Sequence, residues 1–258
     1  MGSRTVVADV ADELARRVAT GEYRPGDLMP SVRQVAEEFG MNRATAQLIL
    51  GRLESYGFVQ ARRGKGFTIR DVRVEGGMDV YRHLFRFSIT APAVAAEMFA
   101  DIVEVERGIV GEALLAYTLG PKVLDQVELT AAVDALEAMA RRPEPDHIQI
   151  IEAEIALVRK LLGVLGMTMQ RAVLNSIADM VVEVPEAVTA YFAVAADLHV
   201  LVWRALLAMW DVESAPSEAQ LALFDDLFTL YHQKVTARFD ELVGEAPVGT
   251  VTRLSSAV

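Results

Sequence analysis

Residues 30–69 read PSVRQVAEEFGMNRATAQLILGRLESYGFVQARRGKGFTI, and this stretch indicates the fold of the first part of the chain. A short helix is predicted over residues 32–39. Ser31 caps its start, Gln34 three residues later completes a capping box, and Gly40 ends it.

A second helix is predicted immediately after the first. Asn42 caps it, it runs over residues 43–56, and Gly57 closes it. Two short helices joined by a tight glycine-containing turn indicate a helix-turn-helix, whose second helix enters the major groove of DNA. The residues of this second helix that we expect to face inward are Ala46, Ile49, Leu50 and Leu53.

The flanking segments complete the pattern. Upstream, residues 6–20 alternate apolar and charged positions at helical spacing, which predicts an amphipathic helix. Downstream, residues 58–61 and 67–69 read as two strands around the basic, glycine-rich turn 62–66. This hairpin is typical of a wing whose cations neutralise backbone phosphates.

Over about residues 5–72, this pattern resembles the DNA-binding domain of the GntR regulators. The resemblance implies a winged helix-turn-helix and a transcription regulator. It rests on Pro25-Gly26-Asp27-Leu28-Met29-Pro30-Ser31-Val32-Arg33, Ala36, Phe39-Gly40, Asn42-Arg43-Ala44-Thr45, Leu53, Gly57 and Arg63-Gly64-Lys65-Gly66.

The resemblance also implies which residues contact DNA. Arg43 suits bidentate reading of a guanine edge, and Gln47 suits adenine. Arg52, further along the helix, is expected on a solvated face. The expected DNA-binding residues are Arg33, Asn42, Arg43, Thr45, Gln47, Arg63, Gly64 and Lys65.

Charge divides the chain of 258 residues. Residues 1–73 carry a net charge of +3, residues 74–258 carry −14, and the whole carries −11. Cysteine is absent, there is no signal-peptide pattern, and no run of 18 uninterrupted apolar residues occurs. We therefore expect a cytoplasmic protein with no membrane segment. No phosphate loop, nucleophile elbow or complete metal signature is present, so we expect no enzyme.

The rest of the chain is expected to be all helical. Breaks at Gly120-Pro121, Pro143-Glu144-Pro145, Gly166, Pro185 and Ala215-Pro216 separate periodic apolar runs. The predicted fold class is therefore mainly α, an N-terminal winged helix-turn-helix followed by a bundle of six or seven helices. The predicted organisation is 1–73 for DNA binding, 74–91 as linker with a first helix, 92–245 for effector binding and dimerisation, and 246–258 as a flexible tail. The predicted helical runs are 78–88, 92–118, 122–141, 146–165, 167–183, 186–211 and 217–243.

A helical domain behind such a head resembles the FadR subgroup. Most of its members hold a divalent metal with an Asp and three His, and the metal anchors a carboxylate effector. Here Val158 stands where one His is expected, which leaves Glu154, His199 and His232 as a partial set. The other type in the subgroup lacks the metal and binds long-chain acyl-CoA; residues 152–177 resemble it without a gap. We therefore expect no required cofactor, and a regulator that controls fatty-acid metabolism in response to long-chain acyl-CoA. A small carboxylate held through a metal is the alternative.

Candidate effector residues come from two sources. Arg107 either binds a phosphate or carboxylate or pairs with Glu104 one turn earlier, and the resembling helices add Asn175, His199, Tyr231 and His232. His199 is as compatible with a satisfied core histidine. Expected partners are this effector, a second copy of the chain and a palindromic double-stranded operator. Candidate lining residues, each also compatible with an ordinary core role, are Met167, Met169, Met180, Phe192 and Trp203.

Overall fold

The computed structural model describes residues 6–211 and 216–245, so the tail predicted over 246–258 lies outside the described residues. The chain divides into two compact units between Ser88 and Ile89, here called unit 1 and unit 2. Each unit is described by itself.

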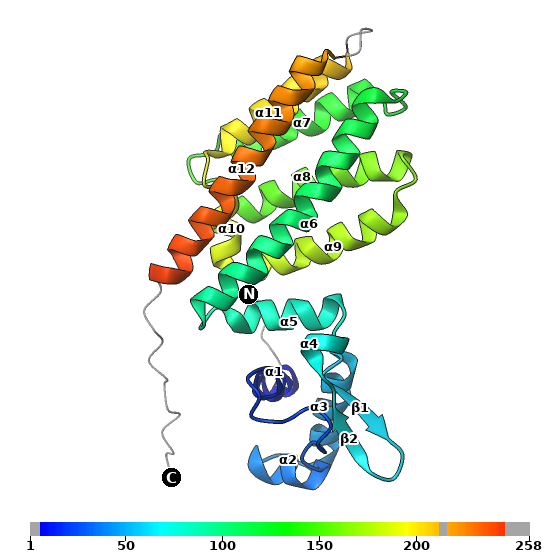
Figure 1. The fold of residues 1–258 in the computed structure, drawn as a ribbon, viewed down its shortest axis with the longest axis vertical. Helices are drawn as coiled ribbons and strands as arrows, with labels where there is room; N and C mark the ends of the chain where they lie inside the picture. Colours follow the sequence, from blue (N-terminus) through cyan, green and yellow to red (C-terminus); the bar gives the residue numbers. More distant parts are fainter. Residues whose placement is uncertain (1–5, 212–215, 246–258) are drawn as a thin grey trace. The chain divides into compact units, whose positions relative to one another are not determined.

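Unit 1 is the predicted winged helix-turn-helix (Figure 1). Helices α1 and α2 both pack against α3, and β1 pairs with β2 in an antiparallel hairpin. Leu14 of α1, Ile49 and Leu53 of α3, and Phe58 are fully buried and form its core. Its elements are α1 (Val6–Ala19), α2 (Val32–Glu38), α3 (Arg43–Ser55), β1 (Val59–Arg62), β2 (Gly66–Ile69), α4 (Val72–Glu75) and α5 (Met78–Ser88).

Both predicted helix caps are confirmed. Ser31 accepts from the Gln34 backbone N–H, and the Gln34 side chain accepts from the Ser31 backbone N–H at 2.8 Å. Asn42 Oδ1 accepts from the Thr45 backbone N–H at 2.8 Å. These bonds satisfy helix-end donors that would otherwise have no partner, and so fix where α2 and α3 begin.

The segment predicted as a linker with a first helix joins unit 1 instead of leading away from it. Helix α5 packs against α1; Val80 is 3% exposed and belongs to the core of unit 1, and Leu84 and Phe87 pack against that core. Arg86 pairs with Asp12 of α1 at 2.8 Å. Burial of one face of α5 and this ion pair hold it to the DNA-binding fold.

Unit 2 contains seven helices within the described residues, in agreement with the predicted bundle. The longest, α6 and α12, lie side by side along their length (Figure 1). Helices α7 and α8 pack together, as do α8 and α9, and α11 packs on α7. The helices are α6 (Pro92–Leu119), α7 (Gln126–Ala140), α8 (His147–Val164), α9 (Thr168–Val182), α10 (Pro185–Tyr191), α11 (Ala196–Trp210) and α12 (Glu218–Glu245).

The single helix predicted over 186–211 is wrong. Two helices, α10 and α11, meet there at a bend of 56°. The backbone leaves helical geometry at Phe192, whose ψ is 33°. The Phe192 ring stacks between His147 and His199, with centroid distances of 3.8 Å and 5.0 Å. Packing of this ring accompanies the bend, and residues 192–195 contain no Gly or Pro to signal it.

Among the described residues, no single helix is both long and apolar enough to cross a membrane, and the bent pair α10 and α11 meets that test only when its two arms are counted together.

Candidate nucleic-acid interface and ligand cavity

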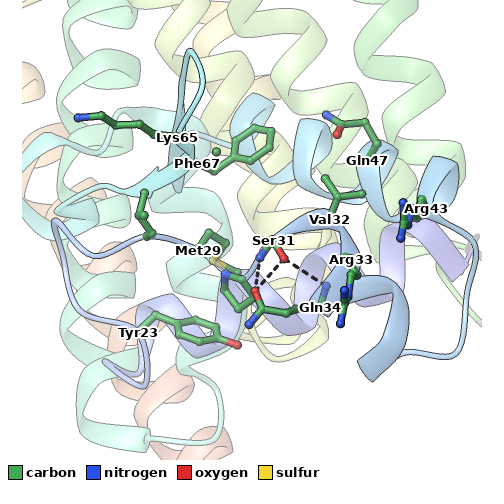
Figure 2. Close-up of a pocket in the computed structure, with 13 residues that line it drawn as sticks. Tyr23, Met29, Ser31, Val32, Arg33, Gln34, Arg43, Gln47, Lys65 and Phe67 are labelled. Carbon is green, nitrogen blue, oxygen red and sulfur yellow. Dashed lines mark hydrogen bonds between the residues drawn. The ribbon is translucent and has the colours of Figure 1, made fainter.

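A groove of about 770 Å³ runs between the wing and the helix-turn-helix of unit 1. Figure 2 shows Lys65 on the wing at one side and Arg33, Arg43 and Gln47 on the helices at the other. The groove therefore collects four of the eight predicted DNA-binding residues. Its lining is Tyr23, Leu28, Met29, Pro30, Ser31, Val32, Arg33, Gln34, Arg43, Gln47, Lys65, Gly66 and Phe67.

The first turns of α3 present two side chains that are predicted to read bases. Arg43 and Gln47 are exposed, and their i, i+4 spacing places them on one face of the helix. Arg43 makes no hydrogen bond or ion pair with any other described residue. Asn42 and Thr45 are occupied with each other, because Thr45 Oγ1 also donates to Asn42 Oδ1 at 3.1 Å. The structure therefore places both as residues that fix the helix start.

Arg33 and the wing supply the remaining cations. Arg33 pairs with Glu37 at 2.9 Å, with both side chains well exposed. Such a pair contributes only ~0.3–0.5 kcal/mol, so a phosphate can replace the carboxylate. At the wing tip, Arg63, Gly64 and Lys65 are exposed, and only Lys65 of the three also lines the groove. Gly64 has φ +75°, a conformation that favours glycine.

The sequence indicated the environment of Arg52 but not the groove positions of Leu28 and Tyr23. Arg52 was expected away from the groove, and its Nε donates to the Tyr56 hydroxyl at 2.6 Å. Leu28 and Tyr23 line the groove but were not singled out from the sequence. Leu28 is 58% exposed although it pairs with Thr68 in an isolated bridge beside β2. An apolar residue beside a wing strand carries no sequence signal for DNA contact.

Unit 2 contains a partly open cavity of about 440 Å³. Side chains of α6, α8, α9, α10, α11 and α12 line it, and most of them are apolar. This volume lies within the ~300–1,000 Å³ typical of ligand pockets. Its apolar lining includes Val110, Leu114, Ile151, Ile155, Val158, Leu174, Ile177, Val181, Leu206, Phe224 and Phe228.

Two acid–histidine pairs face this cavity. Glu154 accepts from His199 Nδ1 at 3.1 Å and from Trp203 Nε1 at 3.1 Å. His232 Nδ1 donates to the Phe228 carbonyl at 2.7 Å, and its Nε2 lies 3.0 Å from Glu106 Oε2. The exposed fractions of His199 and His232 are 8% and 4%. Each buried imidazole is therefore held by a buried or half-buried carboxylate.

Burial and these carboxylates shift the titration of the cavity groups. Burial lowers the pKa of His199, but the charge of Glu154 and its hydrogen bond raise that pKa by more, with a further contribution from the Tyr191 carbonyl. The pKa values of the Tyr191 and Tyr231 hydroxyls are raised well above their ordinary value, chiefly by burial. Both tyrosines therefore stay protonated at neutral pH.

The structure gathers some predicted effector residues and not others. His199, Tyr231, His232 and Trp203 line the cavity. Neither Arg107 nor Asn175 does, which corrects the expectation for both.

Each of these two residues is engaged elsewhere. Arg107 pairs with Glu104 at 2.9 Å, the alternative that its spacing allowed. Asn175 is exposed and accepts from Arg159 at 2.6 Å. The other apolar candidates, Met167, Met169, Met180 and Phe192, also do not line the cavity.

The partial metal set does not come together as a metal site. Over residues 6–211 and 216–245, no three His, Asp or Glu side chains are grouped so that they could hold a metal ion. Glu154 is paired with His199, whereas His232 is paired with Glu106. Both ring nitrogens of His232 are already hydrogen-bonded, so neither has a lone pair directed at a metal. The residues present do not fit the metal of the subgroup.

Comparison with known proteins shows which proteins unit 1 resembles. Residues 7–69 match the family model for bacterial regulatory proteins of the gntR family. The chain is 40% identical over 84 residues to the HTH-type transcriptional regulator Mce2R of Mycobacterium tuberculosis, a match covering 32% of this chain and 35% of that protein. It is 27% identical over 84 residues to the fatty acid metabolism regulator protein of Pasteurella multocida, again 32% and 35% of the two chains.

The chain also has a low structural similarity, with a TM-score of 0.46, to the solved structure of Lar, which is described as controlling expression of the Listeria monocytogenes agr system. The two sequences are 15% identical, and the match covers 94% of this chain and 97% of that one. The curated relatives are matched over only about a third of their length, and they are transcription regulators, not enzymes. Unit 1 is a winged helix-turn-helix domain, and its residues 7–69 are similar to the gntR family of bacterial regulatory proteins.

Proposed function

We propose that the chain is a ligand-responsive transcription regulator, in which unit 1 binds operator DNA and unit 2 senses an effector. One observation carries the DNA-binding half. Arg33 of α2, Arg43 and Gln47 of α3, and Lys65 of the wing line one exposed groove. Helices α2 and α3 and the wing thus present three cations and one amide to the same groove. DNA requires both, because its phosphates are anionic and its base edges are read by hydrogen bonds.

The roles of these residues follow from their chemistry. Arg43 stands unpartnered at the start of the recognition helix, where its guanidinium can donate two bonds to a guanine edge. Gln47, one turn later, suits adenine. Arg33 and Lys65 suit phosphates, which set the position of the protein without reading sequence.

We further propose that the chain acts as a homodimer in the cytoplasm. Residues 74–258 carry a net charge of −14, which disfavours contact of this part with the DNA backbone. Dimerisation through unit 2 would set two recognition helices on the two halves of a palindromic operator.

For the effector, we favour long-chain acyl-CoA and a role in fatty-acid metabolism. The support is the largely apolar cavity, since each buried CH₂ of an acyl chain contributes ~0.8 kcal/mol. A second support is the similarity to a protein named for regulating fatty acid metabolism.

DNA binding is tested by selection from a pool of random duplexes with the full chain. The proposal predicts enrichment of one sequence with two inverted half-sites. A pool that stays random after repeated rounds, while the protein remains folded, would contradict it.

The effector is tested by thermal unfolding in the presence of long-chain acyl-CoA. Ligand at a hundredfold excess over its dissociation constant stabilises the native state by ~2.7 kcal/mol. A clear rise in melting temperature supports the assignment. No rise with acyl-CoA, together with a rise for a short hydroxy acid, would overturn it.

A further inference from the structure

Two polar atoms in the cavity of unit 2 have no hydrogen-bond partner. They are the hydroxyl of Tyr191 and Nε2 of His199, both cut off from solvent and both without a partner among the described residues. Tyr191 and His199 line the same cavity. Native proteins leave few buried polar atoms unsatisfied, because each one costs its full desolvation. A ligand that enters the cavity can supply the missing partner.

The protein's own bonds decide which chemistry the ligand must offer. His199 Nδ1 donates to Glu154, whose carboxylate also accepts from Trp203. Nδ1 is therefore satisfied, and Nε2 is the ring atom left to face a ligand. The Tyr191 hydroxyl remains protonated and is free to donate. An unpartnered hydroxyl donor in an apolar cavity calls for an oxygen that accepts.

The other charges around the cavity restrict the ligand further. Glu106 and Glu154 both line it, whereas Lys234 is the sole Lys or Arg among its described lining residues. A phosphate with two negative charges would meet two carboxylates there. A single carbonyl or carboxylate oxygen is compatible with this balance.

The apolar lining of the cavity also reaches the surface of unit 2. Leu201 of α11 and Leu227 of α12 line the cavity and are 61% and 57% exposed. A hydrocarbon chain in the cavity therefore has apolar contacts up to its exposed edge.

We propose, resting on the acyl effector of the proposed function, that Tyr191 and His199 are the polar anchor of the cavity. The Tyr191 hydroxyl donates a hydrogen bond to the carbonyl or carboxylate oxygen at the head of an acyl chain, and Nε2 of His199 is the second polar atom that this head group meets. A free fatty acid and an acyl thioester share this chemistry, and the experiment distinguishes them.

The test compares Tyr191→Phe with the parent protein by calorimetric titration of palmitate and of palmitoyl-CoA. Loss of one hydrogen bond to the ligand weakens binding about 10-fold. The same substitution should leave the melting temperature of the ligand-free protein unchanged or raise it, because the hydroxyl has no partner to lose.

Tyr231→Phe is the matched control. The Tyr231 hydroxyl lies at the same cavity but already donates to the Tyr191 carbonyl at 3.0 Å. Its removal should lower the melting temperature of the ligand-free protein and change ligand affinity less than Tyr191→Phe does.

Each outcome decides something. Weaker binding of either ligand by Tyr191→Phe supports the anchor, and the ligand that binds the parent identifies the source of the acyl group. Equal affinity of parent and Tyr191→Phe overturns the anchor and leaves the acyl effector standing. No binding of either ligand to the parent overturns both, while the DNA-binding half of the proposed function stands or fails by the duplex selection. A marked loss of stability in ligand-free Tyr191→Phe also overturns the anchor, because it reveals a structural partner.

Discussion

The groove of unit 1 and the cavity of unit 2 hold their polar side chains in opposite states. Arg43, Gln47 and Lys65 are exposed at the groove. In the cavity, His199 and His232 are buried and each is bound to a carboxylate. Exposed cations exchange their hydration water for phosphates and bases at little cost. Buried, partnered groups accept only a ligand that matches the few atoms left unsatisfied.

This difference predicts where single substitutions act. A change at the groove should alter DNA affinity with little effect on folding, because the side chains make few contacts. A change at the cavity should alter stability and ligand affinity together.

The largest effect is expected for Arg43→Ala. It removes a base contact of ~1–3 kcal/mol in each half-site, so sequence-specific binding should be lost while the fold persists. Titration of the selected duplex at fixed salt measures this. Arg52→Ala is the control, since that arginine is on the same helix but is bound to Tyr56. Equal affinities of Arg43→Ala and the parent would mean that α3 does not read the bases.

Gly57→Ala should destabilise unit 1 by at least ~1–2 kcal/mol. Gly57 has φ +88°, and an added Cβ would lie 2.8 Å from Val80 Cγ2 of α5. Chemical denaturation of the full chain measures the loss. Gly26→Ala shares the φ of +88° but meets open space, so it should cost less. If the two variants lose the same stability, the close approach of α5 to the end of α3 is not what constrains Gly57.

Lys65→Ala should weaken specific and non-specific duplexes by a similar factor. It removes one phosphate contact, so the slope of log affinity against log salt should fall by about one. Anisotropy titrations across a salt series measure the slope. A loss confined to the selected duplex would instead assign Lys65 to base reading.

The smallest effect is expected for chelation of divalent metal ions. Both ring nitrogens of His232 are hydrogen-bonded, and Glu154 is shared by His199 and Trp203. Treatment with a chelator should therefore leave the melting temperature and DNA affinity unchanged. Loss of stability that zinc or nickel restores would favour the metal-held carboxylate.

The same contrast explains what the sequence could predict. The caps at Ser31 and Asn42, the turn at Gly57 and the wing all depend on residues a few positions apart. Their chemistry is therefore visible in one short stretch. The position of Arg43 at the groove follows directly from the cap beside it.

The cavity could be predicted only in outline. Glu106 and His232 meet across 126 positions, and no local pattern joins them. Arg107 does not line the cavity because the α6 residues that do, Glu106, Val110 and Leu114, recur every four positions on one face of the helix, and Arg107 is not among them. Tyr191 was not singled out because the bend that follows it lacks Gly and Pro.

If a ligand in unit 2 controls DNA binding by unit 1, one titration should show it. The selected duplex is titrated with the full chain, with and without saturating long-chain acyl-CoA. A ligand-responsive regulator with coupling of ~1–3 kcal/mol should show a change in DNA affinity of about 5- to 150-fold. Identical affinities with and without acyl-CoA, when thermal unfolding shows that the ligand is bound, would contradict the claim that unit 2 controls DNA binding by unit 1.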